Sequence, residues 1–353
     1  MFWKVLLSPI DPPLLQFPSV DIVVPARNEA DSLPQSLPSL LAQDYAGEWR
    51  VVLVDDHSRD GTADLAHKIA SDSGKENRLT IISAPDLPQG WSGKVAAMNA
   101  GASSSSAALI LFTDADIRHA PHSLSLLVRH IEAKKLDLVS RMVLLNCTSF
   151  AEKLLIPAFV FFFAMLYPFR RANNPQSHVA AAAGGTMLLR RSMLDKIGGM
   201  ACIKSALIDD CSLARAVKDA GGKIELTLTR DIDSLRPYPH IRDVWQMVAR
   251  TAYTQLRYSP WLLIGTIAGM GLLYITPVLL FLFAPTLWAL TTGFMAWAIM
   301  TVIYLPMIKF YDLPRAWAVT LPVAALVYAA ATLDSARLYI QGRGGQWKDR
   351  AQA

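Results

Sequence analysis

Apolar and polar positions alternate in blocks over the first half of the chain, and the blocks have the lengths of strands and helices. Apolar runs bounded by polar residues predict strands at 20–25, 50–55, 79–83 and 107–113. Between them, apolar residues recur at helical spacing and predict helices at 29–42, 62–70 and 94–102. Because strands alternate with helices, the pattern predicts an α/β fold with a parallel sheet covered by helices on both faces.

The second half of the chain is dominated by long apolar segments, at about 261–283, 287–308 and 313–333. Each approaches or exceeds the roughly 20 residues that a membrane-spanning helix needs. A shorter apolar segment at 154–169 is followed by two arginines and predicts an interfacial or buried helix. We therefore expect a membrane-proximal segment at 1–17, a folded domain at 18–258, transmembrane helices within 259–335, and a basic tail at 336–353.

The charges that flank the apolar segments bear on how they cross a membrane. Lys309 and Arg315 mark the second loop as cytoplasmic, which agrees with a cytoplasmic first half. The tail is also basic, yet an odd number of spans would place it outside. Either the third segment is re-entrant, with a break at Pro322, or the positive-inside rule fails here.

The composition narrows the class of protein further. Hydrophobic residues make up 52% of the chain and charged residues only 18%. The formal net charge of +5 comes without a long Lys/Arg run, which favours attraction to a membrane surface and not to nucleic acid. Cys147, Cys202 and Cys211 have no C-x-x-C spacing, so thiolate metal sites and disulfides are not expected. No signal peptide is evident at the N-terminus.

Two carboxylates, Asp114 and Asp116, follow the fourth predicted strand. Side chains at i and i+2 point to the same side of an extended chain, and the carboxyl ends of strands in such sheets face the ligand crevice. Mg²⁺ or Mn²⁺ would relieve their mutual repulsion and commonly binds one or two carboxylates plus substrate phosphates. The alternative is that Asp114 caps the next helix and Asp116 is solvated.

Other polar residues follow the first three strands. Asp55 or Asp56 is a candidate to accept hydrogen bonds from a nucleobase, and the alternative is a turn in which Thr62 caps a helix. Arg27 suits a phosphate, with Asn28 as the cap of a helix that starts at Glu29. Lys94 opens a helix and also suits a phosphate, unless it is a surface lysine.

Two further motifs lie between the fourth strand and the apolar half. The small residues around Gly184 and Gly185 allow a ligand to approach the backbone closely, or form a tight turn. Asp209 and Asp210 begin a predicted helix, where carboxylates are stabilised by the helix dipole. Either they only cap this helix, or one is a general base that takes a proton from an acceptor hydroxyl.

Taken in order, these motifs resemble the inverting family 2 glycosyltransferases, which have a GT-A fold. The resemblance covers about residues 18–258. It implies that Asp55 or Asp56 contacts the base of a nucleotide sugar, that Asp114 and Asp116 bind the metal and diphosphate, and that Asp210 is the base, with Asp209 beside it. The implied donor-binding set is Pro25, Arg27, Glu29, Asp55, Asp56, Lys94, Asp114, Gly185 and Arg257.

Residues 254–258, Thr-Gln-Leu-Arg-Tyr, stand where processive family members carry Gln-Arg-x-Arg-Trp. Arg257 matches and the other fixed positions differ, so transfer of a single sugar is expected. The stretches 155–163, 206–215 and 249–260 resemble the hopene-associated glycosyltransferases of bacterial hopanoid gene clusters. That resemblance implies a lipid-linked role.

These observations predict a metal-dependent, inverting glycosyltransferase of the bacterial cytoplasmic membrane, with a cytoplasmic catalytic domain. It would use Mg²⁺ or Mn²⁺ and move one sugar from a nucleotide-diphosphate sugar, with uridine as the expected nucleoside, to a membrane lipid such as a hopanoid. A polyprenyl-phosphate or polysaccharide-type transferase and a catalytically silent nucleotide-binding scaffold are the alternatives. A transporter is disfavoured because the stretch 261–308 contains no ionisable side chain of the kind that lines ion pathways.

Overall fold

A computed structural model describes residues 16–343, 346–347 and 350–351. The expected membrane-proximal segment at 1–17 lies almost wholly outside the described residues, as does part of the basic tail. The chain divides into two compact units, which are described separately. The first holds residues up to Leu145, Tyr167–Arg236 and the chain from Trp347, and the second holds Asn146–Leu166 and Pro237–Gln346. The domain limits predicted from the sequence, 18–258 and 259–335, stay a prediction.

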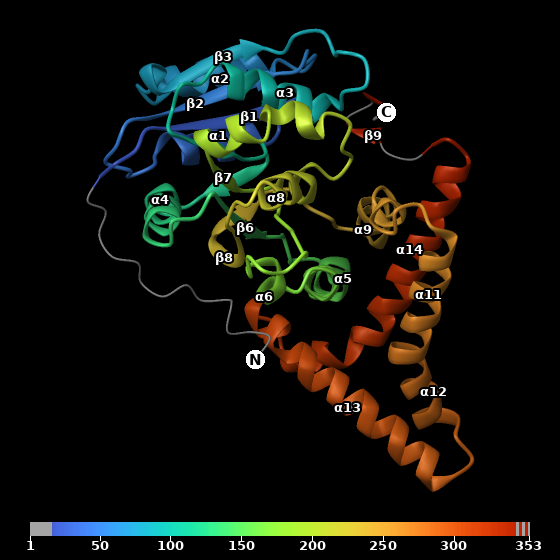
Figure 1. Cartoon of the computed structure of the whole chain (residues 1–353). Coiled ribbons are helices and arrows are strands. Elements are labelled where there is room, and N and C mark those ends of the chain that lie inside the picture. The colour runs from blue at the N-terminus through green and yellow to red at the C-terminus, as the bar shows by residue number, and fades with distance from the viewer. Residues whose placement is uncertain (1–15, 344–345, 348–349, 352–353) are drawn as a thin grey trace. The chain divides into compact units, whose positions relative to one another are not determined.

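The first unit contains alternating strands and helices (Figure 1). Its strands are β1 Val20–Ala26, β2 Trp49–Asp55, β3 Leu79–Ser83, β4 Leu109–Phe112, β5 Ile117–His119, β6 Leu138–Leu144, β7 Met187–Arg190 and β8 Ile224–Ser234. Its helices are α1 Leu33–Leu41, α2 Thr62–Asp72, α3 Gly93–Ser103, α4 Ser123–Ala133, α6 Phe169–Ala172, α7 Arg191–Lys196 and α8 Asp209–Asp219, with short turns η2 Glu76–Arg78 and η3 Gly199–Ile203.

Among the described residues, these strands form one sheet in the order β3-β2-β1-β4-β7-β6-β8-β5. The first four strands in this order are parallel, as the sequence predicts. The sheet as a whole is mixed, however, because β7 runs antiparallel to both β4 and β6, and β5 runs antiparallel to β8. The parallel arrangement predicted for the strands at 20–25, 50–55, 79–83 and 107–113 is therefore confirmed, and the strands of the second half were not predicted.

Both faces of the sheet are buried, because alternate residues of each strand point to opposite sides. On β1, Ile22 and Val24 pack with Leu37 of α1 and with apolar residues of α2 and α4. Val23 points the other way and packs with Val95 of α3 and with apolar residues of α7 and α8. The strand ends are thus held between two helical layers, which fixes the loops that carry the candidate site.

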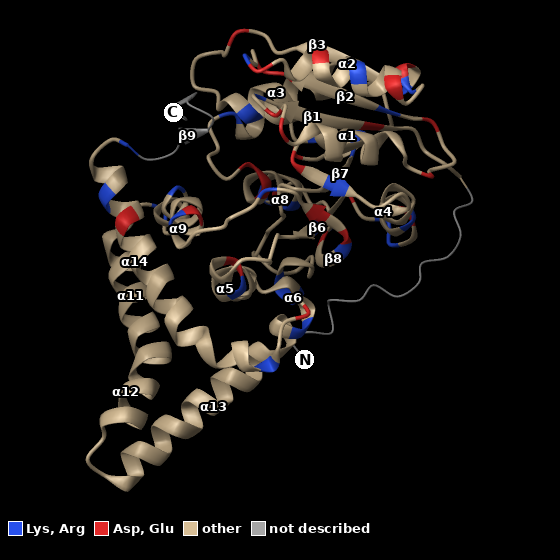
Figure 2. Cartoon of the chain, turned by 180° about the vertical axis from the view of Figure 1, so that it is seen from behind, with Lys and Arg blue, Asp and Glu red and all other residues tan. Residues whose placement is uncertain are grey.

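The second unit consists of helices. They are α5 Phe150–Leu166, α9 Ile241–Ala249, α10 Ala252–Gln255, α11 Pro260–Met270, α12 Thr276–Phe283, α13 Leu287–Phe310 and α14 Leu321–Ile340, with η4 Gly271–Ile275 and η5 Arg315–Thr320. The short strands β9 Gln346–Trp347 and β10 Arg350–Ala351 come after α14 in the chain, and β10 belongs to the first unit. Three stretches are long and apolar enough to cross a membrane: Pro260–Phe283, Leu287–Phe310 and Arg315–Ile340. Figure 2 shows that α11, α12 and most of α13 carry no charged residue.

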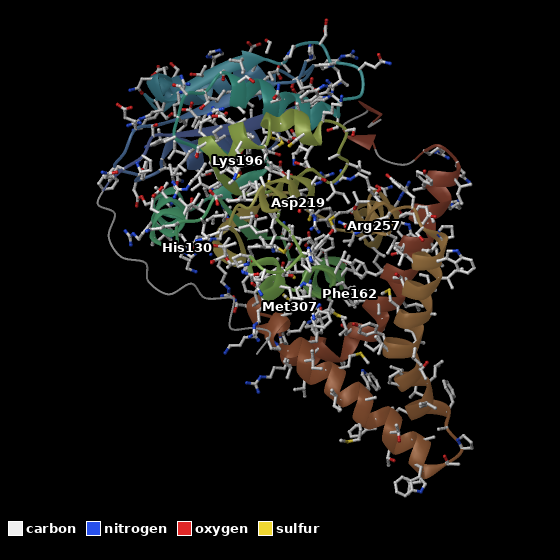
Figure 3. The ribbon with its side chains drawn as sticks, viewed as in Figure 1. His130, Phe162, Lys196, Asp219, Arg257 and Met307 are labelled. Carbon is white, nitrogen blue, oxygen red and sulfur yellow. The ribbon has the colours of Figure 1, made fainter. Side chains whose placement is uncertain are left out.

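The third of these stretches has no break in the middle at Pro322. This proline lies in the first turn of α14, where its missing N–H leaves no hydrogen bond unmade, and the preceding residues form η5. Helix α5 packs against α13 and α14 through its aromatic residues. Phe161 contacts Tyr304, and Phe162, labelled in Figure 3, contacts Tyr328 with 5.3 Å between the ring centroids. Ten residues of α5 are buried, so the helix is largely covered within this unit.

Candidate active site

The loops after β1 and β2 are joined by hydrogen bonds. The backbone N–H of Glu29 donates to Thr62 Oγ1 (2.9 Å), that of Ala30 donates to Asp60 Oδ2 (2.9 Å), and that of Asn28 donates to Ser58 Oγ (3.0 Å). Arg59 N donates in return to the side chain of Asn28. The two loops therefore form one connected edge beyond the carboxyl ends of the strands.

These bonds correct two predictions about helix starts. The first helix begins at Leu33, with Ser32 as its N-cap, and not at Glu29 after an Asn28 cap. The N–H groups of residues 28–30 are used by the neighbouring loop, and Asn28 itself has a left-handed backbone (φ 51°). Thr62 likewise does not cap α2, because Gly61 is the N-cap and Asp60 Oδ1 accepts the Thr62 N–H.

The acidic pair after β2 is divided between two environments. Asp56 is buried, and its carboxylate lies 3.6 Å from Arg27 Nη1, which also donates to the Asp56 carbonyl oxygen. Asp55 is half-buried, and its carboxylate accepts a long hydrogen bond of 3.3 Å from Ser58 N. Asp55 is thus the more accessible carboxylate of the two. Pro25 is buried within β1, in register with Val54.

Lys94 lies at the centre of a group of carboxylates. Ser92 caps α3 by accepting a hydrogen bond from Val95 N. Lys94 therefore lies in the first turn of this helix. Lys94 Nζ is 2.8 Å from Asp114 Oδ1 and 3.2 Å from Asp209 Oδ2. Burial alone would lower the pKa of Lys94, but Asp114 and Asp209 outweigh it and raise the pKa above its usual value. The ammonium is therefore permanently charged.

Asp210 is held by the backbone at the N-terminus of α8. Its Oδ2 accepts from Gly184 N (2.8 Å) and its Oδ1 accepts from Cys211 N (2.6 Å). Burial, followed by the charge of Asp209, raises the pKa of Asp210 to about 6. A carboxylate with a pKa just below neutral pH is ionised there and can still accept a proton.

Gly184 lies next to both Lys94 and Asp210. A Cβ at this position would lie 3.4 Å from Lys94 Nζ and 3.5 Å from Asp210 Oδ2, so both charged atoms lie directly against the backbone of residue 184. Gly185 is more restricted, because a Cβ there would lie 2.9 Å from Val143 Cγ1. The two glycines permit β7 to start close to the carboxylates.

The Asp114-Ala115-Asp116 tripeptide lies in a turn between β4 and β5, and not in extended strand as predicted. Ile117 N donates to the carbonyl oxygen of Asp114, which closes the turn. Leu235 N donates to the carbonyl oxygen of Asp116 (2.8 Å), and the next residues, β5, pair antiparallel with β8. Ala115 is buried, whereas both carboxylates are half-buried.

A buried polar network lies behind this turn and was not predicted from the sequence. Thr113 Oγ1 donates to the carbonyl oxygen of Gly185 (2.8 Å) and lies 3.0 Å from His119 Nε2. His119 Nδ1 in turn lies 3.1 Å from Ser123 Oγ, which donates to Gln43. Burial lowers the pKa of His119 to about 3, so the ring is neutral. No local sequence pattern identifies these contacts, since their partners are up to about 80 positions apart.

The carboxylates outnumber the cations at the centre of the site. Burial raises the pKa of Asp114 despite the opposing effect of Lys94, and Asp116 raises it further. Burial and the charge of Glu29 raise the pKa of Asp116. With Asp209 and Asp210 nearby, Lys94 leaves a surplus of negative charge and of oxygen ligands.

This donor set is chemically suited to a hard divalent cation. Within the described residues, no group of three or more His, Cys, Asp or Glu side chains is arranged to hold a metal on its own. Such a group is not needed where one or two carboxylates act together with the phosphates of a substrate. Asp114 and Asp116 therefore fit a cation that binds with a diphosphate.

Arg257 belongs to the second unit. It follows α10 and has a left-handed backbone (φ 52°), and its N–H donates to the Thr254 carbonyl oxygen (2.9 Å) (labelled in Figure 3). The next residue, Tyr258, stacks on Tyr339 of α14 with 4.3 Å between the ring centroids. The altered motif at 254–258 thus forms a tight turn before α11.

Solved structures support the fold assignment. The chain is similar to the mannosyltransferase PcManGT from Pyrobaculum calidifontis, solved in complex with GDP-Man and Mn²⁺, with a TM-score of 0.52 and 19% sequence identity. The match covers 92% of this chain and 91% of that one. The first unit is thus a Rossmann-like GT-A domain, as the resemblance found in the sequence implies.

Curated relatives match over the first part of the chain. An undecaprenyl-phosphate 4-deoxy-4-formamido-L-arabinose transferase of Pseudomonas fluorescens is 34% identical over 111 residues, which is 31% of this chain and 31% of the relative. An N-acetylglucosaminyltransferase of Rhizobium leguminosarum bv. viciae is 40% identical over 109 residues, which is 31% of this chain and 24% of the relative. The matches span less than a third of the length of either relative.

A family model described as glycosyl transferase family 2 matches residues 21–198, half of the chain. The matched range includes the joined loops after β1 and β2, Lys94, the Asp114-Ala-Asp116 turn and the two glycines before β7. The chain belongs to glycosyl transferase family 2.

Proposed function

We propose that this glycosyltransferase moves one sugar from a nucleotide-diphosphate sugar to a membrane lipid, with inversion at the anomeric carbon. The observation that carries the proposal is the position of Asp210. Backbone N–H groups orient both of its oxygens, and it lies against Gly184 beside Lys94, which pairs with Asp114. A general base and a cation that suits phosphate are thus next to each other.

In the proposed reaction, Asp210 takes the proton of the acceptor hydroxyl as its oxygen attacks the anomeric carbon. The attack comes from the face opposite the diphosphate, so the bond to the diphosphate breaks and the configuration inverts. Lys94 stabilises the charge on the departing phosphate, in exchange for one of its carboxylate partners. Asp209 keeps the pKa of Asp210 raised, which strengthens it as a base.

A bound divalent cation, Mg²⁺ or Mn²⁺, would neutralise diphosphate charge and ease departure of the nucleotide. Asp114 and Asp116 are the residues that would hold it. The presence of Mn²⁺ with GDP-Man in the structure of PcManGT supports this assignment.

The joined loops after β1 and β2 are the proposed site for the nucleoside. Asp55 is the better placed of the acidic pair to accept hydrogen bonds from a base, since Asp56 is buried against Arg27. We propose that Pro25, Arg27 and Glu29 shape this nucleoside site through the loop backbone, and that Gly185 and Arg257 contribute to donor binding. Uridine is the nucleoside expected for the family, and guanosine is the alternative, supported by the GDP-Man in PcManGT.

Two lipid classes are candidates for the acceptor. The resemblance to hopene-associated enzymes favours a hopanoid hydroxyl, whereas the name of the Pseudomonas fluorescens relative favours a polyprenyl phosphate. The need for a general base differs between these two acceptors. A hydroxyl must lose a proton to become a good nucleophile, but a phosphate monoester is already anionic at neutral pH. Because Asp210 has the features of a base, we favour the hydroxyl.

The three apolar stretches support a place in the cytoplasmic membrane, with several passes and the catalytic unit in the cytoplasm. The altered motif at 254–258 supports transfer of a single sugar instead of processive synthesis.

The test is a donor and acceptor panel with purified full-length protein. UDP- and GDP-linked sugars are each incubated with Mn²⁺ and with either a hopanoid alcohol or undecaprenyl phosphate, and glycolipids are identified by mass spectrometry. We expect one donor to give a singly glycosylated hopanoid. Formation of a polyprenyl-phosphate sugar alone would replace the favoured acceptor with the alternative. Absence of any glycolipid, with nucleotide-sugar binding intact, would support the silent scaffold.

A further inference from the structure

A basic groove lies within the second unit, between α9 and the C-terminal end of α14. Its volume is about 840 Å³. We call it the arginine groove, because its lining includes Arg242, Arg250, Arg337 and Arg343 together with Trp245 and Asp334. None of these residues was singled out for chemistry in the sequence, and none belongs to the proposed donor site.

One arginine of the groove is fixed by an internal ion pair. Asp334 Oδ1 lies 2.7 Å from Arg337 Nη2, and its Oδ2 accepts from Trp245 Nε1 (2.9 Å). The indole of α9 and the guanidinium of α14 are thereby locked to the same carboxylate. This triad gives the groove one ordered wall and uses the negative charge of Asp334.

The other three arginines are exposed. Arg242, Arg250 and Arg343 form no ion pair with any residue that the structure describes. Four guanidinium groups therefore face a single carboxylate that is already paired. Guanidinium groups bind phosphate with two parallel hydrogen bonds, so the missing counter-charge is best supplied by a phosphate.

The groove lies where the apolar part of the unit ends. Between Arg315 and Asp334 the chain has no charged residue, so Asp334 and Arg337 are the first charges after a stretch long enough to cross a bilayer. Helices α9, α10 and α11 all pack on α14, and α11 begins its own charge-free stretch at Pro260. Figure 2 shows the charges gathered on α9 and on the adjacent end of α14, above the uncoloured helices.

Helix α9 has the character of a helix that lies at a membrane surface. Val244 and Val248 are buried, whereas Arg242 and Arg250 are exposed on the groove side and Ile241 is exposed beside them. Trp245 of the same helix also lines the groove, and tryptophan is enriched in membranes where the hydrocarbon meets the headgroups. The groove thus offers both phosphate ligands and an apolar edge.

We propose that the arginine groove binds the phosphate headgroup of an anionic phospholipid from the surrounding bilayer. The headgroup phosphate would pair with Arg242, Arg250 and Arg343, and the acyl chains would continue along the apolar surface of α14. The proposal rests on the membrane placement proposed above, but not on the sugar, the acceptor or the catalytic residues. In this proposal, α9 holds the second unit at a negatively charged membrane surface.

The test uses full-length protein in nanodiscs of equal parts phosphatidylcholine and phosphatidylglycerol. The protein is released into mild detergent, and retained lipids are identified by native mass spectrometry. The double variant Arg242→Gln/Arg250→Gln is compared with wild type, and Arg315→Gln is the matched control, since it removes a charge at the other end of the same apolar stretch. A parallel sample contains inorganic phosphate in excess.

We expect wild type and Arg315→Gln to retain phosphatidylglycerol selectively. An arginine near an anionic membrane surface contributes about a fivefold gain in binding, so the double variant should lose roughly 25-fold of that selectivity. Equal retention of both lipids, or the same selectivity in the double variant, would overturn the proposal and leave membrane placement intact. Displacement of the lipid by inorganic phosphate alone would assign the groove to a soluble anion. Failure of the wild type to enter nanodiscs would contradict the membrane placement itself.

Discussion

Asp210 differs from an ordinary helix-capping aspartate in its surroundings. Backbone N–H groups from two elements orient it, while burial and Asp209 raise its pKa to about 6. Lys94 works in the opposite direction and keeps the carboxylate ionised near neutral pH. The balance between these charges should be visible in the pH dependence of the reaction.

The raised pKa of Asp210 should appear in the pH dependence of kcat/KM. If Asp210 is the base, kcat/KM should rise with pH through about 6, because the base is active only after it loses its proton. In Asp209→Asn the neighbouring negative charge is gone, so the pKa of Asp210 should fall and the acidic limb should move to lower pH. A pH–rate profile of both proteins checks this. An unmoved limb would contradict the coupling of the two aspartates.

At this scale, the sequence allowed the identities of the charged residues to be predicted better than their partners. Asp114, Asp210 and Lys94 follow strands or start helices, which is a local pattern. The difference in burial between Asp55 and Asp56 depends on Arg27, which reaches Asp56 from the neighbouring loop. The buried network of Thr113 and His119 depends on tertiary contacts alone, and these leave no local signal.

At the level of the elements, helix α3 packs closely on the sheet. A Cβ on Gly101 would lie 2.4 Å from Val23 Cγ1 and 2.9 Å from Val54 Cγ2, so α3 lies directly on β1 and β2. Gly101→Ala should therefore destabilise the first unit by about 1–3 kcal/mol through overpacking. Thermal unfolding of this variant is compared with Ser103→Ala, an exposed position on the same helix. Equal stability of the two variants would contradict the packing.

Glu152 joins two segments of the second unit. Its carboxylate accepts from the N–H groups of Thr148, Ser149 and Tyr238. Burial alone would raise the pKa of Glu152, but these hydrogen bonds outweigh it and hold the pKa below its usual value. The carboxylate therefore connects the start of α5 to the segment that leads into α9.

Glu152→Gln should destabilise the second unit by about 2 kcal/mol, because an amide cannot accept all of these bonds. The pKa of Glu152 is lowered by folding, so its contribution is present above the pKa of the unfolded chain and is lost as pH falls through the folded value. Unfolding midpoints measured at neutral and acidic pH check both points. A variant as stable as wild type at neutral pH would show that the bonds contribute nothing net.

The elements were predictable where the hydrophobic period was clear. The first three strands and α2 and α3 lie close to their predicted positions, because each has a strong local pattern. The start of α1 was wrong because loop hydrogen bonds use the N–H groups of residues 28–30. The antiparallel strands β5 and β7 were missed because strands of three or four residues are too short to show a period.

The whole molecule combines a GT-A unit with apolar helices, and its activity should depend on a divalent cation. Treatment with EDTA should abolish sugar transfer, and added Mn²⁺ or Mg²⁺ should restore it. Asp116→Asn should reduce transfer by about 100-fold or more at saturating metal, since it removes one of two proposed ligands. Steady-state transfer rates check these effects. Full activity in EDTA would contradict the proposed metal role of Asp114 and Asp116.

We propose that Asp210 activates a lipid hydroxyl for attack on a nucleotide sugar. The most direct test measures single-turnover sugar transfer to lipid by wild type and by Asp210→Asn, with donor binding measured in parallel by calorimetry. The amide keeps the size of the side chain and one acceptor oxygen but cannot take the proton. We predict that transfer falls by about 10²- to 10⁴-fold while donor affinity stays within a few fold. Normal transfer by Asp210→Asn would show that Asp210 is not the base.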